Sequence, residues 1–464
     1  MRAFIVVDLG FGDSGKGLLT DFLVRRASAG LVVRFNGGAQ AGHRVVTADG
    51  RSHTFAQFSA GTLAGARTFL SRHVLVHPTA LLREGAALEQ SGVRQVFYRI
   101  AISENARLIT PFHQAANRLR EMIRGESRHG SCGIGVGETV QDSLDYPNDA
   151  IVAGDLRDQA LLRRKVQRLH ERKRIEMREL CTSAAPGAEL DLERGIFDRP
   201  DVVDLWIEEA SRLGALGVVA PDSRLGEWMG NSGSVVFEGA QGVLLDEWCG
   251  FHPYTTWSSC TCDNALKLLS ECPSQFQTFR IGVLRTHAIR HGAGPLPSEA
   301  SALLPPQFEH NRQNRWQGRV RYGWFDAVLA RYALDAVGGV DALALTHADG
   351  LRRLPTWKTC AGYLGAKIPQ DCDLVADVGG NGLVTRLVVP VKERTDHQVR
   401  LTQLLSRVAP QLEEVESKET TVFDRVQQLL GRTVDIVSRG PRATDVFFRK
   451  ECLAVSAAVQ QMQE

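Results

Sequence analysis

The sequence predicts an α/β fold with a central, mostly parallel β-sheet flanked by helices. Short apolar runs recur at residues 3–9, 31–35, 234–238, 279–284 and 342–346, and each leads into a loop of small or polar residues. The segments between the runs are long enough to hold helices, which is the alternation typical of a parallel sheet. Because ligands gather at the carboxyl ends of parallel strands, we expect the loops after these runs to form the functional site.

The first run ends in a glycine-rich turn that carries one lysine. Gly10, Gly15 and Lys16 satisfy the spacing G-x-x-x-x-G-K, in which backbone N–H groups and a lysine cradle phosphates. Gly17 stands where an ordinary P-loop has a Mg²⁺-binding Ser or Thr, and Asp13 lies inside the loop. A carboxylate among phosphates is repelled unless a metal or a proton transfer offsets the repulsion, so we expect Asp13 to have a chemical role. The alternative is a strand-to-helix turn that binds nothing.

The second run is followed by the polar loop Asn36–His43. Taken alone, His43 fits a solvated loop histidine. Beside Asp13 it acquires a function, because a carboxylate base and an imidazole acid across one phosphate site activate an oxygen nucleophile and steady the developing charge.

Two further segments have readable patterns. Residues 156–230 are expected to be largely helical, and the Lys/Arg-dense stretch 161–178 has apolar residues at near-helical spacing, which favours an amphipathic surface helix over an RNA-binding arm. Those apolar residues are Leu161, Leu162, Val166, Leu169 and Ile175. Leu383–Val389 is expected to be a strand that Pro390 ends.

Composition limits the class of protein and its expected partners. The 464 residues are 43% hydrophobic and 23% charged with a net charge of +2, which permits a large core and gives no reason to expect nucleic acid or membrane as partner. No apolar run reaches the roughly 18 residues of a membrane helix, so we expect a cytoplasmic location. Nine cysteines without repeated spacing do not form a disulfide framework. Cys249, His252, Cys260 and Cys262 cluster but lack the usual zinc-site spacing.

Together the first two loops resemble the adenylosuccinate synthetase family, whose pattern is G-D-E-G-K-G followed by N-x-x-x-A-G-H. The resemblance continues in the family's order to about residue 441. The further matching segments are Phe237–Gly242, Pro253–Thr256, His291–Glu299, Gly318–Asp326, Leu345–Asp349 and Ser438–Pro441. The resemblance implies one domain over residues 1–464, with 156–230 as a helical subregion and 351–418 as the least similar segment, and it implies a homodimer.

The resemblance further implies a ligase that uses GTP and Mg²⁺. The 6-oxygen of a purine nucleotide, IMP, would be phosphorylated, and the amino group of L-aspartate would then displace the phosphate to give adenylosuccinate, GDP and phosphate. Asp13 would take the ring proton, His43 would donate to the developing charge, Lys16 would neutralise phosphate, and Gln241 would complete the catalytic set. Asp13 and the Gly42 backbone would hold the metal.

The other implied sites follow the motifs residue by residue. The amino acid would meet Gln317, Gly318 and Arg319. The acceptor nucleotide would contact Asp13, Asn36, Gln40, Ala41, Gly42, His43, Ser131, Gln241, Thr256 and Arg319. GTP would contact Gly12, Ser14, Gly15, Lys16, Gly17, Leu18, Gly42, His43, Arg321, His347, Asp349, Ser438 and Gly440.

Two of these assignments also have a reason in the residues themselves. A carboxylate such as Asp349 accepts hydrogen bonds from the two N–H groups on the edge of guanine, a pair that adenine lacks. Arg319 and Arg321 lie two apart, so on an extended segment both would face one side and suit a carboxylate or phosphate. His347 replaces the family's lysine, so ATP remains an alternative to GTP.

The acceptor side departs from the family. Cys132 stands at an arginine position of the family's G-T-T-G-R-G-I-G, and a second family arginine has no counterpart in the acidic stretch Leu144–Ala150. Losing a charge-assisted contact to phosphate costs about 1.5–3 kcal/mol. Compensation would come from His129, Arg290 or Arg128, among which the sequence does not choose.

Three hypotheses therefore stay open. The first is the ligase acting on IMP. The second is the same chemistry on GMP or dGMP, as in the phage 2-aminoadenylosuccinate synthetases, or on another acceptor or amine; Ser14, in place of the family's glutamate, and the altered region 128–150 favour it. The third is a non-catalytic GTP-binding homologue, against which the retention of Asp13 and His43 argues.

Overall fold

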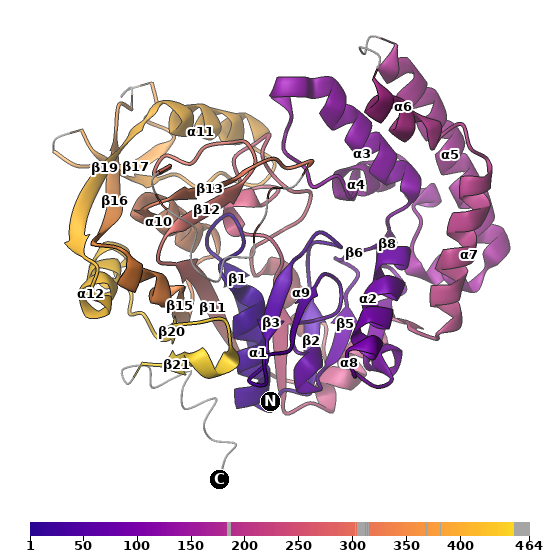
Figure 1. Ribbon diagram of the computed structural model, residues 1–464, viewed down its shortest axis with the longest axis horizontal. Coiled ribbons are helices and arrows are strands. Elements are labelled where there is room, and N and C mark those ends of the chain that lie inside the picture. The colour runs from indigo at the N-terminus through magenta and orange to yellow at the C-terminus, as the bar shows by residue number, and fades with distance from the viewer. Residues whose placement is uncertain are drawn as a thin grey trace.

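A ten-stranded sheet forms the centre of the computed structural model, which describes residues 1–182, 187–301, 303, 311, 313, 315–366, 370–380 and 382–449. Figure 1 shows this sheet with helices on both faces. The strand order is β21-β20-β15-β11-β1-β10-β2-β5-β7-β9, and β21 (Val446–Phe448) alone among these strands runs antiparallel to its neighbour. The mostly parallel α/β fold predicted from the sequence is confirmed.

The five predicted apolar runs are the five central strands, side by side and all parallel. They are β15 (Ala342–Thr346), β11 (Gln277–Arg285), β1 (Arg2–Asp8), β10 (Ser234–Glu238) and β2 (Leu31–Arg34). Their ends differ from the predicted ones by at most two residues. The outer strands are β20 (Ile436–Ser438), β5 (Arg67–Leu70), β7 (Ile100–Ser103) and β9 (Val219–Ala220).

Both faces of the sheet are buried, as a parallel sheet requires. Alternate residues of β1 point to opposite faces. Phe4 and Val6 pack with helix α1 (Lys16–Arg26), whereas Ala3, Ile5 and Val7 belong to the larger core on the other face, which includes residues of α10 (Ala327–Ala336).

Most of the helices gather at two ends of the sheet (Figure 1). On the side of β5 and α2 lie α3 to α7, α10 and α12 lie near β15 and β20, and α11 lies beside β17 and β19. The remaining bounds are α2 (Pro78–Gln90), α3 (Pro111–Arg124), α4 (Val136–Asp145), α5 (Gln159–Cys181), α6 (Ala188–Gly195), α7 (Asp201–Ala215), α8 (Ser223–Gly230), α9 (Asp263–Ser270), α11 (Thr395–Arg407) and α12 (Glu419–Leu430).

The predicted helical region 156–230 is present as α5 to α8 with the short strand β9. The amphipathic helix over 161–178 is confirmed within α5, but Ile175 is 50% exposed and does not belong to its buried face. Lys173 is buried instead, because the carboxylates of Glu138 and Glu176 each lie 3.0 Å from its ammonium.

The segment 351–418, together with β14, builds a second, five-stranded sheet. It contains β14 (Phe325–Asp326), β16 (Thr356–Leu364), β17 (Val375–Val378), β18 (Val384–Leu387) and β19 (Ala409–Glu416). The predicted strand Leu383–Val389 is therefore confirmed as β18 with shorter ends. Three ladders complete the fold: β3 (His43–Val46) with β4 (Ser52–Phe55), β6 (Leu75–Val76) with β8 (Arg107–Leu108), and β12 (Ala288–His291) with β13 (Val320–Gly323).

The carboxyl ends of β1, β2, β10, β11 and β15 lie at one edge of the sheet, since these strands are parallel neighbours. Asp8, Arg34, Glu238, Arg285 and Thr346 are their last residues. In the part of the chain that the structure describes, no helix is both long and apolar enough to cross a membrane.

Candidate active site

The glycine-rich loop after β1 is held in a tight turn. Gly12, Asp13 and Gly15 have φ values of 95°, 58° and 93°, and Gly15 is the N-cap of α1. Gly12 also lies beside the backbone of Gln241, whose own φ is 56°. The left-handed turn thus points the start of α1 at the carboxyl edge of the sheet, where an N-terminus favours anions.

Asp8, which the sequence interpretation missed, is the centre of this loop. Its carboxylate accepts hydrogen bonds from the backbone N–H of Gly10 and Ser14 and from the Ser14 hydroxyl, each at 2.9 Å. The Lys16 ammonium lies 2.7 Å from the same carboxylate, and both side chains are buried. The signal in the sequence was a carboxylate at the end of an apolar run, directly before the glycine-rich turn.

Gly17 is explained by close packing against His43. A Cβ at position 17 would lie 2.7 Å from the Cβ of His43 and 3.1 Å from its backbone. A serine or threonine does not fit there, so the ordinary P-loop magnesium ligand is missing for a steric reason. The same contact brings the second predicted loop against the first.

His43 is held by a buried glutamate. Its Nδ1 lies 2.6 Å from Oε1 of Glu238, and Glu238 also accepts the Ala60 backbone N–H at 3.1 Å and lies 3.9 Å from the Arg34 guanidinium. Burial lowers the pKa of His43 although Glu238 acts in the opposite direction, and His43, with Arg34, keeps the pKa of Glu238 low against the effect of burial. The buried glutamate therefore fixes the imidazole by its Nδ1 edge.

Asp13 contacts a histidine that the sequence interpretation assigned no role. Nε2 of His291 lies 3.0 Å from Oδ2 of Asp13, and the Arg285 guanidinium donates to the Asp13 carbonyl at 3.1 Å. Burial by itself would raise the pKa of Asp13, but His291, Lys16 and Arg285 together hold it below its ordinary value. The structure therefore brings Asp13, Lys16 and His43 to one loop cluster, with Asp13 as a carboxylate.

The loop 36–42 is tied to the segment after β10. The side-chain amide of Asn36 donates to the Ala240 carbonyl at 2.9 Å and accepts from the Ala240 N–H at 2.7 Å, and Asn36 is fully buried. Gln241 lies against Gly37, and Gln40 against Gly38. Ala41 is half-buried, and Gly42 is exposed at the end of the loop. Asn36 joins two loops here, and contact of this loop with a nucleotide stays a prediction.

Two histidines lie together beside β11 and β15. The rings of His287 and His347 are edge-to-face with centroids 5.7 Å apart, and His347 Nδ1 lies 2.9 Å from the Thr346 hydroxyl. Burial holds the pKa values of both far below the ordinary histidine value. They are therefore neutral near pH 7, so His347 does not supply the charge of the lysine it replaces.

The predicted guanine-recognising residues lie on neighbouring segments. Asp349 is half-buried in the turn after β15, and burial raises its pKa. Ser438 ends β20, the strand paired with β15, and its hydroxyl donates to the Gly440 carbonyl at 2.9 Å. This places the three residues at one side of the same edge.

The two arginines of the arginine-rich segment share one glutamate. Glu299 lies 2.7 Å from Arg321 and 3.5 Å from Arg319, which agrees with the prediction that both face one side. Arg321 is mostly buried and also donates to the carbonyls of Gly292 and Gly294, whereas the Arg319 side chain is 77% exposed. Gln317 and Gly318 precede them, and the Gln317 carbonyl lies beside Gly292.

In the loop His129–Gly135, where the acceptor nucleotide is expected, polar groups are hydrogen-bonded to other residues of the chain. The Ser131 hydroxyl bonds with the Asn117 amide, and the backbone N–H groups of Gly130 and Ser131 donate to the buried carboxylate of Glu121 at 2.8 and 3.2 Å. Ser131 therefore reaches a phosphate only after breaking these bonds. Thr256 lies elsewhere, in the segment between β10 and α9, and its N–H donates to the Leu245 carbonyl of the same segment.

Of the three candidates for compensation, Arg290 is engaged elsewhere. It is 2% exposed, donates to the carbonyls of Ala293 and Pro295, and lies over the ring of Phe11. Arg128 is exposed and His129 half-buried, so these two keep the geometric freedom that a phosphate contact needs.

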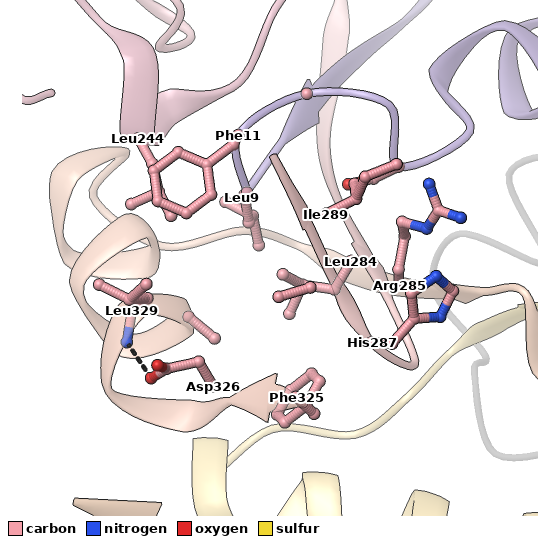
Figure 2. A pocket seen from close by; sticks show the side chains of 15 residues that line it. Leu9, Phe11, Leu244, Leu284, Arg285, His287, Ile289, Phe325, Asp326 and Leu329 are labelled. Carbon is pink, nitrogen blue, oxygen red and sulfur yellow. Dashed lines mark hydrogen bonds between the residues drawn. The ribbon is translucent and has the colours of Figure 1, made fainter. Parts of the chain in front are cut away.

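A cavity is lined in part by the glycine-rich loop after β1, through Gly10, Gly12 and Ser14. Figure 2 shows Leu9, Phe11, Leu244, Leu284, Phe325 and Leu329 around it, with Arg285 and His287 together at one side. Its polar edge includes Asp326, which caps α10 by accepting the N–H groups of Val328 and Leu329. Most of the side chains that line the cavity are apolar.

Among the described residues, the Cys249–Cys262 segment included, no group of three or more His, Cys, Asp or Glu has the arrangement of a metal site. Each of the eight described cysteines is free, as expected. A parallel sheet with a phosphate loop, a carboxylate and a glutamate-held histidine at its carboxyl edge defines the class of phosphate-binding α/β enzymes.

The comparisons with known proteins identify the family. The family model for adenylosuccinate synthetase matches residues 5–447. The adenylosuccinate synthetases of Thioalkalivibrio sulfidiphilus and Pseudomonas fluorescens are 30% and 31% identical, each with 94% of this chain and 96% of the relative aligned. The chain belongs to the adenylosuccinate synthetase family and is a ligase that forms carbon–nitrogen bonds.

Two solved structures share the fold. A fully ligated adenylosuccinate synthetase from Plasmodium falciparum matches with a TM-score of 0.72 and 17% identity over 97% of this chain and 100% of its own. The cyanophage S-2L succinoaminodeoxyadenylate synthetase, bound to dGMP and dATP, matches with a TM-score of 0.56 and 17% identity over 99% of both chains.

Proposed function

We propose that this ligase joins L-aspartate to carbon 6 of IMP, with GTP and Mg²⁺, through a 6-phosphoryl intermediate. The observation that carries the proposal is the pairing at the sheet edge: Asp13 is held by His291 and His43 by Glu238, and the charge of Lys16 acts on both. Those are the base and the acid that phosphorylation of a ring oxygen requires.

Asp13 takes the proton from the purine ring. Its depressed pKa keeps it a carboxylate at neutral pH, and its side chain is 32% exposed, so a substrate can reach it. Removing the ring proton makes the 6-oxygen a better nucleophile toward the γ-phosphate.

His43 donates a hydrogen bond to the oxygen that gains charge. Glu238 holds Nδ1, which leaves Nε2 to face the substrate. In the protein without ligands burial lowers the pKa of His43, and the negative charge of bound phosphates acts in the opposite direction. Lys16 neutralises phosphate, and Gln241 orients the acceptor from the segment packed on Gly12 and Gly37.

A magnesium ion fits the residues present. Mg²⁺ is usually bound by one or two carboxylates together with substrate phosphates and water rather than by a full protein cage. Asp13 and the exposed Gly42 backbone are such a partial set, and Gly17 supplies no side-chain oxygen at the position where an ordinary P-loop has its magnesium ligand. The metal supplies charge neutralisation of the transferring phosphoryl group.

GTP is the proposed phosphoryl donor because half-buried Asp349 can accept both N–H groups of guanine, with Ser438 and Gly440 beside it and Arg321 on the GTP side. Arg319 is the proposed anchor for the aspartate substrate, because its guanidinium is exposed and its contact with Glu299 is long. Gln317 and Gly318 flank it.

A guanine nucleotide, GMP or dGMP, is the second candidate acceptor. The observation in its favour is the acceptor loop, where Ser131 is bonded to Asn117 and Glu121 and the family's arginine is Cys132. The phage relative of the same fold is described with dGMP bound, which agrees with this candidate. We further propose a single domain over residues 1–464 and a homodimer in the cytoplasm.

The test is to incubate the protein with Mg²⁺, aspartate and GTP against IMP, dIMP, GMP and dGMP in parallel, and to follow phosphate release and adduct mass. An IMP adduct is the expected result, and a GMP or dGMP adduct selects the second candidate. If none of the four gives a product, the result would point to another acceptor or amine, or to a non-catalytic homologue. Asp13→Ala is the matched control, and wild-type turnover by that variant would overturn the mechanism.

A further inference from the structure

Four donors in the glycine-rich loop Gly10–Lys16 bind the same internal carboxylate, that of Asp8. The N–H of Gly10, the N–H and hydroxyl of Ser14 and the ammonium of Lys16 all contact Asp8, at 2.7–2.9 Å. The Asp8 side chain is fully buried, so it lies inside the loop and not at its mouth. An anion that belongs to the chain thus already holds four donors of the loop.

Lys16 is as deeply buried as its partner. It is 3% exposed, and among the described residues its hydrogen bond is to Asp8. A phosphate that binds in this loop therefore draws on an ammonium, and on the N–H of Ser14, that a carboxylate already holds. A carboxylate and a phosphate oxygen compete directly for such donors, because both are anionic acceptors.

Position 14 fits this arrangement. The family's loop has glutamate where this chain has Ser14, whose hydroxyl donates to Asp8 at 2.9 Å. A glutamate at this place would bring a second carboxylate against the first, and like charges at hydrogen-bond distance repel. The small hydroxyl residue and the internal carboxylate are therefore mutually compatible.

We propose that Asp8 sets the nucleotide affinity of this enzyme by competing with the nucleotide's phosphates for Lys16. Asp8 holds the empty loop closed, gives up Lys16 when the triphosphate binds, and takes it back as the diphosphate leaves. The proposal rests on the proposed function, since it places a nucleoside triphosphate in this loop.

The first test compares wild-type protein and Asp8→Asn by calorimetric titration with GTP–Mg²⁺ and, in parallel, ATP–Mg²⁺. The amide keeps the shape but removes the charge. The loss of a charge-assisted competitor is expected to lower Kd for the bound nucleotide about tenfold. Association is expected to become faster.

Asp435→Asn is the matched control. Asp435 is also buried and accepts a backbone N–H, from Leu343, and a hydroxyl, from Thr433, both at 2.8 Å. It precedes β20, at the amino end of the parallel strands and away from the site. A comparable loss of stability without a change in Kd is expected for this variant.

A second measurement uses the wild-type chain and no nucleotide, so it stands even if Asp8→Asn fails to fold. Amine acylation followed by mass spectrometry should label Lys16 at least about tenfold more slowly than Lys267, an exposed lysine for which the described residues show no ion pair, because the Lys16 amine is buried and held by a carboxylate. Equal labelling would show that Lys16 is not retained by Asp8.

The outcomes are distinct. Tighter nucleotide binding by Asp8→Asn with slow labelling of Lys16 supports the proposal. Unchanged or weaker binding by a folded Asp8→Asn overturns it and leaves the proposed function in place. A wild-type protein that binds neither GTP nor ATP overturns both.

Discussion

Nε2 of His291 lies 3.0 Å from Oδ2 of Asp13, so that a histidine from β12 stands against the carboxylate of the phosphate loop. The matching segment of the family has valine at this position, and His291→Val therefore removes the contact with a residue that the fold accepts.

The first prediction concerns pH. His291 is the largest of the groups that lower the pKa of Asp13 against the effect of burial, so this pKa rises when His291 is removed. Since the base must be ionised, the acidic limb of the kcat profile should move to higher pH in His291→Val, while kcat near pH 8 stays within about threefold of wild type. Phosphate release measured at a series of pH values, from acidic to alkaline, gives both limbs of the kcat profile. An unmoved acidic limb would show that His291 does not tune Asp13.

The second prediction concerns Glu238→Gln. Glu238 acts to raise the pKa of His43, so the variant should have a lower His43 pKa and should lose activity at a lower pH on the alkaline side. Loss of a correctly held acid is expected to reduce kcat by about a hundredfold. Steady-state kinetics over pH, with Kd for GTP as the control, separate this effect from a general loss of structure.

The third prediction concerns Gly17→Ser, which restores the ordinary P-loop residue. The added Cβ meets the Cβ of His43 at 2.7 Å, so we expect a destabilisation of about 1–3 kcal/mol and a fall in kcat. Gly195→Ser is the control, because its Cβ meets nothing within 4 Å. Urea denaturation measures both, and a stable, active Gly17→Ser would contradict the packing explanation.

The fourth prediction concerns the choice of nucleotide. Asp349→Asn loses one acceptor for guanine and should raise KM for GTP about tenfold to a hundredfold, since a charge-assisted hydrogen bond is lost. Activity with ATP, which does not depend on this contact, is the internal control. Equal changes with both nucleotides would remove Asp349 from guanine recognition.

The fifth prediction concerns stability. Burial raises the pKa of Asp326 to about 6 even though Val328, Leu329 and Tyr363 donate to it. The folded state therefore binds this proton more tightly than the unfolded state, so its contribution is complete below about pH 4 and is lost as the pH rises to about 6, by roughly 3 kcal/mol. Asp326→Asn should flatten this slope while keeping the cap of α10. Unfolding free energies in urea at a series of pH values test this, and parallel curves for both proteins would contradict it.

The sequence by itself determined the central sheet and the two loops of the site. The runs that became β1, β2, β10, β11 and β15 are apolar because strands covered on both faces must be, and that local property is legible without the structure. The glycine spacing before Lys16 is equally local. The sequence interpretation failed at Ile175, where helical spacing alone placed a half-exposed residue on the buried face.

Only the tertiary structure decided which side chains meet. Glu238 reaches His43 across 195 residues because β10 and β2 are neighbours in the sheet, and His291 reaches Asp13 because β12 follows β11 beside β1. The hydrogen bonds from Lys16 to Asp8 and from Ser131 to Glu121 depend on side-chain directions, which sequence spacing does not reveal. Local pattern follows from burial and backbone conformation, whereas these pairs follow from strand order and packing, which bring distant residues within hydrogen-bond distance.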